Sequence, residues 1–414
     1  MTDKLDVLVG GQLVGWLLDM EPLAFEYSGD CLNGLLKSPF AATIALAAGP
    51  INTEAVGAYF ENLLPEGDQR KSLEEQYHVT SIFGMLAAAA WDTAGAMVLR
   101  PSNAAQQKPE YIQQTWEGMA TIIAGHGGPT ESTKASISGA QYKILMSLDA
   151  DGNPLIPVGS TPSTHILKPD INRQGQDIWA SALNETLMMR TAMRCGLEVA
   201  PVRYISVVKS CLVARYDRVS QSGDIVRINQ ADLCQLLKLP STVKYEVDGG
   251  PSFADCYSYV KATSLSPIKD CERLLQWFFF NLYTGNNDSH AKNLSMLQTD
   301  DGPILAPFYD LMCTAVYPGF SRNFALKVGT TYAPGEITPE NLIAFAHDIN
   351  VSVKYLRGIA ANLAAKVMPA LEAAIAELLD NADYTEQVMA ERIRHAVSDI
   401  CKRRAKRMLG MEMG

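Results

Sequence analysis

The sequence predicts an α+β fold, in which a sheet-rich part precedes a helix-rich part. Most candidate elements just before Asn229 are strands, and most after it are helices. Hydrophobic residues make up 47% of the 414 residues, which is enough for a large core. A prior of roughly 150 residues per domain favours two or three domains. We predict three, at residues 1–105, 106–228 and 229–414.

Residues 1–105 are predicted to form a small α+β unit. Leu5–Val9 and Gln12–Leu17 are short β-type runs around Gly10-Gly11, a strong hairpin pattern. Mixed helix and turn signals follow. From Ala104 to Ser136 the chain is polar and rich in Gly, Ser and Thr, which predicts a connection that ends in a loop.

Residues 106–228 are predicted to hold a small sheet that carries one helix. The strand candidates are Tyr142–Leu148, Thr164–Lys168, Val202–Val208 and Cys211–Tyr216. Asp149–Pro162 is rich in turn residues. Ser181–Cys195 has helical apolar spacing and stops at Gly196, which can serve as the C-cap.

Helices dominate the remainder of the chain. They are predicted at Asp270–Leu282, Pro339–Ile349, Val353–Leu379 and Tyr384–Met408. One antiparallel β pair interrupts them, because Leu294–Gln298 and Ile304–Phe308 are apolar runs on either side of a turn at 299–302.

Charge and cysteine usage narrow the class of protein. The net charge of −10 disfavours direct binding to nucleic acid or anionic membranes, so a DNA contact needs a basic patch or a partner protein. The eight cysteines are scattered without a C-x-x-C pair, which fits reduced thiols rather than disulfides or structural zinc. The N-terminus lacks a signal-peptide pattern and no apolar run reaches about 18 residues. We therefore expect a cytoplasmic protein without a membrane span.

The run Asn286–Asn293 carries the chemistry. Asp288 and Asn293 have the separation of the base and the Mg-binding amide in a kinase catalytic loop, although this spacing alone is a weak signal. The predicted hairpin strengthens this signal, because the open end of the hairpin brings Asn293 beside Asp310. Carboxamide and carboxylate oxygens suit Mg²⁺. Alternatively, Asp310 caps a helix that begins at Leu311.

Lys168 and Glu185 form a second candidate pair. Lys168 ends a predicted strand, and Glu185 lies near the start of the helix that follows. A strand Lys paired with a helix Glu is how kinases hold the α- and β-phosphates. The alternatives are an ordinary solvated Lys and a Glu that favours the helix dipole.

Three further features bear on phosphate chemistry. Ser136–Lys143 is a loop-to-strand junction whose small residues allow backbone N–H groups to approach phosphate, or it is an ordinary turn. His290 is expected to organise hydrogen bonds, with acid–base catalysis as the alternative. Lys292 is expected to neutralise a transferring phosphoryl group. The basic run at 402–407 predicts a solvated helix face, with a phosphate or DNA contact as the alternative.

Taken together, these residues resemble the HipA family of bacterial Ser/Thr kinases, the toxin halves of type II toxin–antitoxin systems. The most specific part of the resemblance is Asn287–Asn293 followed by Pro307–Asp310. Also similar are Tyr59–Glu66, Ser136–Lys143, His165–Lys168, Asn184-Glu185, Arg215–Arg218, Ser241–Glu246 and Asp248–Gly250.

The resemblance implies a two-lobed protein-kinase-like fold with a small N-terminal α+β subdomain and a helical C-terminal lobe, using ATP and Mg²⁺. It implies Asp288 as the base, assisted by Lys292, and Asn293 and Asp310 as metal ligands. The implied nucleotide contacts are Ser138, Gly139, Ala140, Gln141, Tyr142 and Lys143 in the loop, Lys168 with Glu185, Ala214, Arg215 and Tyr216 at the hinge, and His290, Ala291, Lys292, Asn293, Tyr309 and Asp310.

The resemblance also implies biological roles. Family members phosphorylate proteins, notably aminoacyl-tRNA synthetases such as the glutamyl enzyme, which halts translation and promotes persistence. They inactivate themselves by autophosphorylation, here expected at Ser136, and pair with a helix-turn-helix antitoxin (HipB-like) that supplies the DNA contact. Two departures are Ala214, where Glu is frequent, and Ser138, where a smaller residue is common and which offers a second phosphorylation site. The alternatives are a catalytically silent corepressor and a small-molecule phosphotransferase.

Overall fold

The structure, a computed structural model, describes residues 3–102, 104, 108–124, 139, 141–171, 177–380 and 382–411. The chain forms two compact units, each assembled from segments distant in sequence. Unit 1 comprises Met1–Lys168, Ala214–Val243 and Ser295–Gly302, and unit 2 comprises Pro169–Val213, Lys244–Leu294 and Pro303–Gly414. The three domains drawn from the sequence stay a prediction.

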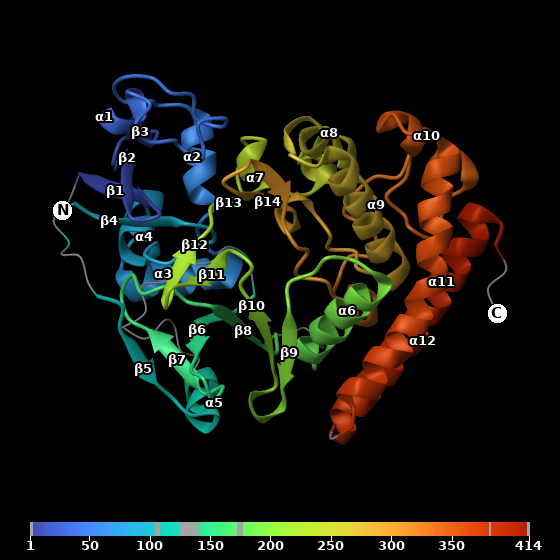
Figure 1. Ribbon diagram of the computed structural model, residues 1–414. Helices are drawn as coiled ribbons and strands as arrows, with labels where there is room; N and C mark the ends of the chain where they lie inside the picture. The colour runs from blue at the N-terminus through green and yellow to red at the C-terminus, as the bar shows by residue number, and fades with distance from the viewer. Residues whose placement is uncertain are drawn as a thin grey trace. The chain divides into compact units, whose positions relative to one another are not determined.

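Unit 1 begins with a four-stranded sheet in the order β3-β2-β1-β4 (Figure 1). Its strands are β1 (Lys4–Val9), β2 (Gln12–Leu18), β3 (Ala24–Tyr27) and β4 (Met97–Pro101). The predicted hairpin is confirmed, because Val9 pairs with Gln12 and both residues of the Gly10-Gly11 turn have positive φ (58° and 80°). Such φ values match the twist of a two-residue hairpin turn.

Short helices and an aromatic core complete the N-terminal part of unit 1. The helices are α1 (Gly29–Leu32), α2 (Glu54–Glu61), α3 (Gly67–Tyr77) and α4 (Ile82–Ala89). The core is built on buried rings in mutual contact, namely Phe25, Tyr27, Phe40, Tyr59 and Phe60. Rings that meet edge to face add to the stability that burial alone provides.

The rest of unit 1 is mainly β structure. Strands β5 (Tyr111–Gln113), β7 (Pro154–Pro157), β6 (Ile144–Leu148) and β8 (His165–Pro169) are neighbours in that order. Two antiparallel pairs follow, β11 (Arg218–Gln221) with β12 (Asp224–Arg227) and β13 (Gln230–Asp232) with β14 (Ser295–Gln298). The helices here are α5 (Trp116–Ala124) and α7 (Leu233–Leu236).

A buried ionic cluster lies within unit 1 and ties its N-terminal part to the later strands. Asp92 accepts hydrogen bonds from Ser163 (Oγ, 2.6 Å), Arg218 (2.8 Å) and Arg227 (3.2 Å). Arg215 also contacts Asp92, at 3.4 Å. Burial raises the pKa of Asp92, but the attraction of the three guanidinium groups outweighs burial and holds that pKa well below its ordinary value.

Unit 2 is built around a helix that is buried nearly all round. It contains α6 (Ser181–Cys195), α8 (Phe253–Thr263), α9 (Pro267–Thr284), α10 (Pro339–Asp348), α11 (Val353–Leu378) and α12 (Tyr384–Leu409). Helix α9 packs against α8, α11 and α12 and buries Trp277 and Phe278–Phe280. A helix whose apolar side chains are buried on nearly every side lies in the core of its unit.

Shorter elements complete unit 2. Strand β9 (Val202–Ile205) pairs antiparallel with β10 (Ser210–Ala214), and β15 covers Pro303–Leu305. Single 3₁₀ turns occupy Ser206–Val208 (η1), Glu246–Asp248 (η2), Ala291–Asn293 (η3) and Thr314–Val316 (η4).

Helix α11 is long and apolar enough to cross a membrane by length and composition alone. It packs against α6, α9 and α12, however, and buries Leu363, Val367 and Leu371 in these contacts. Figure 1 shows α11 and α12 side by side. The helix is therefore a core element of unit 2.

The predicted helices are confirmed, and α6 matches its prediction at both ends, with Gly196 as a left-handed C-cap. Four predictions were wrong in detail. The segment Ala104–Ser136, expected to be a connection, contains β5 and α5, so residues 106–228 carry more than the one predicted helix. Asp149–Pro162 is not only turns, because β7 lies within it. The strand predicted at Val202–Val208 ends at Ile205 and continues as a 3₁₀ turn. Strand β15 covers Pro303–Leu305 instead of Ile304–Phe308.

Candidate active site

Helix α9 delivers the candidate catalytic loop from the core of unit 2. It ends at Gly285, whose φ of 72° is left-handed. A Cβ at this position would lie 2.9 Å from the Cβ of Ala315 and 2.8 Å from Cδ1 of Ile400. Glycine is therefore required, both for the backbone conformation and for the close packing around the start of the loop.

Side-chain amides hold the loop that carries Asp288. Asn286 donates to the side-chain oxygen of Asn281 (2.8 Å), and its own side-chain oxygen accepts from the backbone N–H of Asp288 (3.2 Å). The backbone N–H of Asn287 donates to the hydroxyl of Thr314 (2.8 Å). These bonds fix the backbone on both sides of Asp288, whose carboxylate is half-buried.

Asn293 is fixed against the same loop. Residues Ala291–Asn293 form the buried turn η3. The Nδ2 of Asn293 donates to the backbone carbonyl of Asp288 (3.2 Å), and its N–H donates to the carbonyl of His290 (3.0 Å). Because Nδ2 is used in this way, the amide oxygen is the atom of Asn293 suited to a cation.

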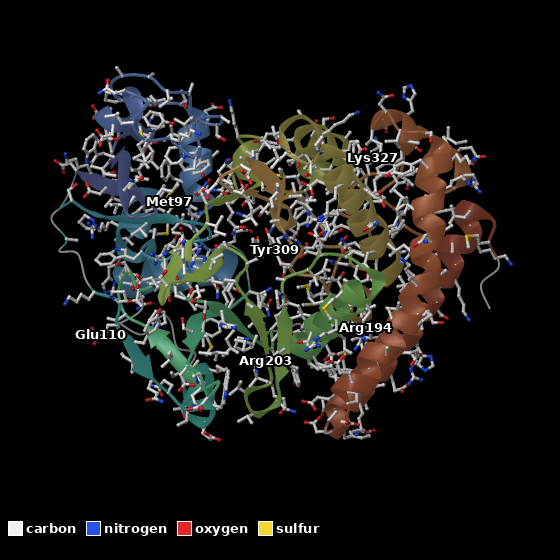
Figure 2. All side chains as sticks on the ribbon, viewed as in Figure 1. Met97, Glu110, Arg194, Arg203, Tyr309 and Lys327 are labelled. Carbon is white, nitrogen blue, oxygen red and sulfur yellow. The ribbon has the colours of Figure 1, made fainter. Side chains whose placement is uncertain are left out.

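The segment that carries Asp310 meets this loop. The hydroxyl of Tyr309, labelled in Figure 2, donates to the backbone carbonyl of Lys292 (2.9 Å). Asp310 adopts a left-handed conformation (φ 59°), which Asp tolerates better than most residues. Residues Leu311–Cys313 form no helix, so Asp310 is not the helix cap that the alternative interpretation requires.

Tyr245 is a site residue that the sequence reasoning missed. Its hydroxyl donates to Oδ1 of Asp288 at 2.6 Å. Its ring meets the buried ring of His290 edge-on, with centroids 5.1 Å apart. His290 is therefore packed against Tyr245, while its expected role as an organiser of hydrogen bonds stays a prediction. The only sequence signal for Tyr245 was its place in the family-like run Ser241–Glu246.

Lys168, in unit 1, and Glu185, in unit 2, are both buried. Lys168 lies in β8 and is 7% exposed, which argues against an ordinary solvated Lys. Glu185 lies in the first turns of α6 and is fully buried. A buried charge is costly without compensation, so burial fits a compensated group in either residue. Their role at a phosphate and their pairing stay predictions.

Part of the predicted nucleotide loop lies outside the described residues, namely Ser136, Ser138 and Ala140. Gly139 has φ +115°, and its carbonyl accepts from the N–H of Glu66 (3.1 Å). A Cβ at Gly139 would come within 2.6 Å of Nζ of Lys143. Gln141 and Tyr142 are half-buried, and burial raises the pKa of Tyr142 to about 12.

The predicted hinge residues are held by internal bonds. The Arg215 guanidinium belongs to the buried ionic cluster and donates to Asp217 (2.7 Å) and to the carbonyl of Thr93 (2.6 Å). The Tyr216 hydroxyl donates to Gln230 (2.6 Å), and Ala214 is the last residue of β10. The Arg215 side chain thus has a structural role, and its backbone N–H donates to the carbonyl of Thr164 (2.9 Å). Its contact with a nucleotide stays a prediction.

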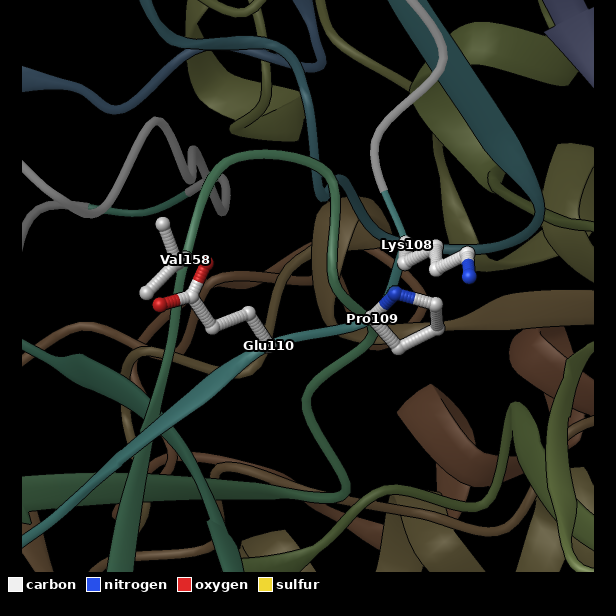
Figure 3. Close-up of a pocket in the computed structure, with 4 residues that line it drawn as sticks. All are labelled: Lys108, Pro109, Glu110 and Val158. Carbon is white, nitrogen blue, oxygen red and sulfur yellow. The ribbon is translucent and has the colours of Figure 1, made fainter.

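A pocket of about 370 Å³ in unit 1 is lined by Lys108, Pro109, Glu110 and Val158 (Figure 3). Backbone bonding shapes it, since the N–H of Val158 donates to the carbonyl of Glu110 (3.0 Å). The described lining contains one base, one acid and no predicted site residue. We therefore assign no chemistry to this pocket.

Comparison with known proteins identifies the family. Residues 5–100 match the HipA N-terminal domain, and residues 135–375 match the HipA-like C-terminal domain. A Sinorhizobium fredii protein named as a kinase, Y4mE, is 32% identical over 96% of this chain and 97% of its own length. The serine/threonine-protein kinase toxin HipA of Shewanella oneidensis is 29% identical over 83% of each chain.

A solved structure shows the same fold. HipA of Shewanella oneidensis MR-1, determined in a complex with HipB and operator DNA, superposes with a TM-score of 0.82. The match covers 99% of this chain and 100% of that one, at 24% identity. The chain therefore belongs to the HipA family of kinase toxins and has the kinase-like fold predicted from the sequence.

Proposed function

We propose that this protein is a Mg-ATP-dependent serine/threonine protein kinase that transfers the γ-phosphate of ATP to a protein hydroxyl. One observation carries the proposal. The candidate base Asp288 and the candidate ligand Asn293 are joined in one loop by the bond from Nδ2 to the Asp288 carbonyl. The Tyr309–Lys292 bond brings the segment of Asp310 to that loop.

The residues fit the roles that phosphoryl transfer requires. Asp288 would accept the proton of the attacking hydroxyl, since its carboxylate is half-buried and its backbone is fixed. Asn293 and Asp310 would offer Mg²⁺ hard oxygen ligands, the kind this cation prefers. When bound, Mg²⁺ supplies neutralisation of phosphate charge. Lys168, with Glu185, would hold the phosphates, and Lys292 would offset charge on the transferring group.

The presence of all four candidate site residues favours an active enzyme over a silent corepressor. A protein that only binds its antitoxin has no need for Lys168, Asp288, Asn293 and Asp310, yet all four are present. The similarity to a named serine/threonine-protein kinase toxin supports a protein acceptor over a small molecule.

We further propose the acceptors and partners that the family resemblance implies. The external acceptor would be a protein of translation, such as the glutamyl-tRNA synthetase. Ser136 would be the site of inactivating autophosphorylation, with Ser138 as the second possibility. A HipB-like antitoxin would provide the contact with operator DNA, which suits a chain of net charge −10. We place the protein in the cytoplasm with these partners.

Intact-mass analysis after incubation with Mg-ATP tests the proposal. The wild type should gain one phosphate, Asp288→Asn should gain none, and Ser136→Ala should separate the two candidate serines. The proposed mechanism is wrong if the wild type phosphorylates neither itself nor casein, which serves as a test acceptor. It is also wrong if Asp288→Asn gains as much phosphate as the wild type.

A further inference from the structure

The carboxylate of the candidate base is held by Tyr245, which lies much earlier in the same segment of unit 2. The Tyr245 hydroxyl donates to Oδ1 of Asp288 at 2.6 Å. A phenol that donates to a carboxylate at this distance makes a strong, charge-assisted hydrogen bond. Forty-three positions separate the two residues, so the fold and not the local sequence creates the contact.

The ring of Tyr245 is itself held from several directions. It meets the His290 ring edge-on, with an interplanar angle of 82°. Nζ of Lys244 lies 5.4 Å from its centroid. Its backbone carbonyl accepts from the N–H of Gly250 (2.8 Å), which closes the turn η2. Because these contacts fix Tyr245, its hydroxyl can hold the Asp288 carboxylate in one orientation.

The neighbouring residue anchors the same turn to a second segment of unit 2. The carboxylate of Glu246 accepts from the backbone N–H of Lys327 (2.8 Å), a residue labelled in Figure 2. Tyr245 is therefore fixed by a turn that is bonded on both sides. The Asp288 side chain cannot rotate about its χ2 torsion without breaking the bond to this hydroxyl.

We infer that Tyr245 is a positioning residue for phosphoryl transfer: it occupies Oδ1 of Asp288 and so presents Oδ2 to the acceptor hydroxyl. This inference rests on the proposed function, because it gives Tyr245 a role only if Asp288 is the base. A general base must lie within hydrogen-bond reach of the proton it takes, so the orientation of its free oxygen affects the rate. Tyr245 does not itself touch the reacting atoms in this account.

The test is the effect of Tyr245→Phe on the turnover of Mg-ATP, measured as kcat and KM for ATP in the full-length protein. Phenylalanine keeps the ring packing and removes the hydroxyl. Tyr204→Phe is the matched control, because Tyr204 also donates to a carboxylate of unit 2, that of Glu386 (2.8 Å). Melting temperatures of both variants report any general loss of stability.

We expect Tyr245→Phe to lower kcat by about tenfold or more, since base catalysis as a whole contributes roughly 10²–10⁴-fold. KM for ATP should change less than about twofold, because orienting the base does not bind nucleotide. Tyr204→Phe should leave kcat unchanged.

The measurements distinguish a failure of the proposed function from a failure of the inference about Tyr245. A wild type without turnover, or an Asp288→Asn variant with full turnover, refutes the proposed function and this inference with it. An active wild type and an inactive Asp288→Asn, combined with an unchanged kcat for Tyr245→Phe, refute the inference alone. A loss of kcat matched by Tyr204→Phe would show a purely structural role.

Discussion

Replacing Asp92 with asparagine should destabilise unit 1 strongly, because Asp92 balances three buried or half-buried arginines. The cluster contains Arg215, Arg218 and Arg227 against Asp92 and Asp217. With Asp92 neutral, three cations face a single anion. Removing one partner of a buried ion pair costs about 3–5 kcal/mol, since the remaining charge is left uncompensated in a poorly solvated site.

Urea unfolding followed by circular dichroism measures this effect. Asp68→Asn is the matched control, because the Asp68 side chain is 81% exposed and pairs with Lys71 only at 3.8 Å. That change should alter the free energy of unfolding by less than about 0.5 kcal/mol. If Asp92→Asn is no more destabilising than Asp68→Asn, the reasoning about the cluster is wrong.

The same cluster predicts the sign of the pH dependence. The pKa of Asp92 in the folded protein lies below its value of about 3.9 in an unfolded chain. The stabilisation is therefore fully present at neutral pH and is lost as the pH falls below about 4. Burial and the nearby Arg215 lower the pKa of Arg218 to about 10, which leaves it protonated at neutral pH. The stability difference between wild type and Asp92→Asn should accordingly be largest near pH 7 and shrink in acid.

Three further substitutions test the site. Gly285→Ala should cost at least about 1–2 kcal/mol in urea unfolding, because the residue is left-handed and its Cβ would crowd Ala315. Asn184→Ala should cost about 1–3 kcal/mol or more in the same assay, since Asn184 bonds both the N–H (2.9 Å) and the carbonyl (3.1 Å) of buried Cys313. Asn293→Ala should lower the rate of γ-phosphate transfer by about 100-fold or more, with an increased Mg²⁺ requirement, because a ligand of the charge-neutralising cation is lost. An unchanged Mg²⁺ dependence would remove Asn293 from the metal site.

Local signals made most of the fold predictable. Helix α6 was bounded correctly because its apolar spacing ends at Gly196, and α12 because its apolar spacing runs from Tyr384 almost to Leu409. Helix α9 starts three residues earlier than its predicted start, Asp270, and Pro267 at its first turn is the signal that could have shown this. Strand β7 was not foreseen, because its four residues include two prolines and it exists through pairing with β5 and β6.

The site was predictable where its residues are close in sequence. Asp288 and Asn293 share one loop, so their spacing could point to them. The Tyr245–Asp288 bond joins residues 43 positions apart, and no spacing rule leads to it. For the same reason the sequence gives no sign that the Arg215 guanidinium contacts Asp92, 123 positions away.

Quantitative phosphoproteomics of cells that express the wild type or Asp288→Asn tests the central claim most directly. We expect at least one serine or threonine of a translation protein to be phosphorylated only with the wild type, together with the chain's own Ser136 or Ser138. Identical phosphorylation in the two cultures, with both proteins present at equal levels, would contradict it.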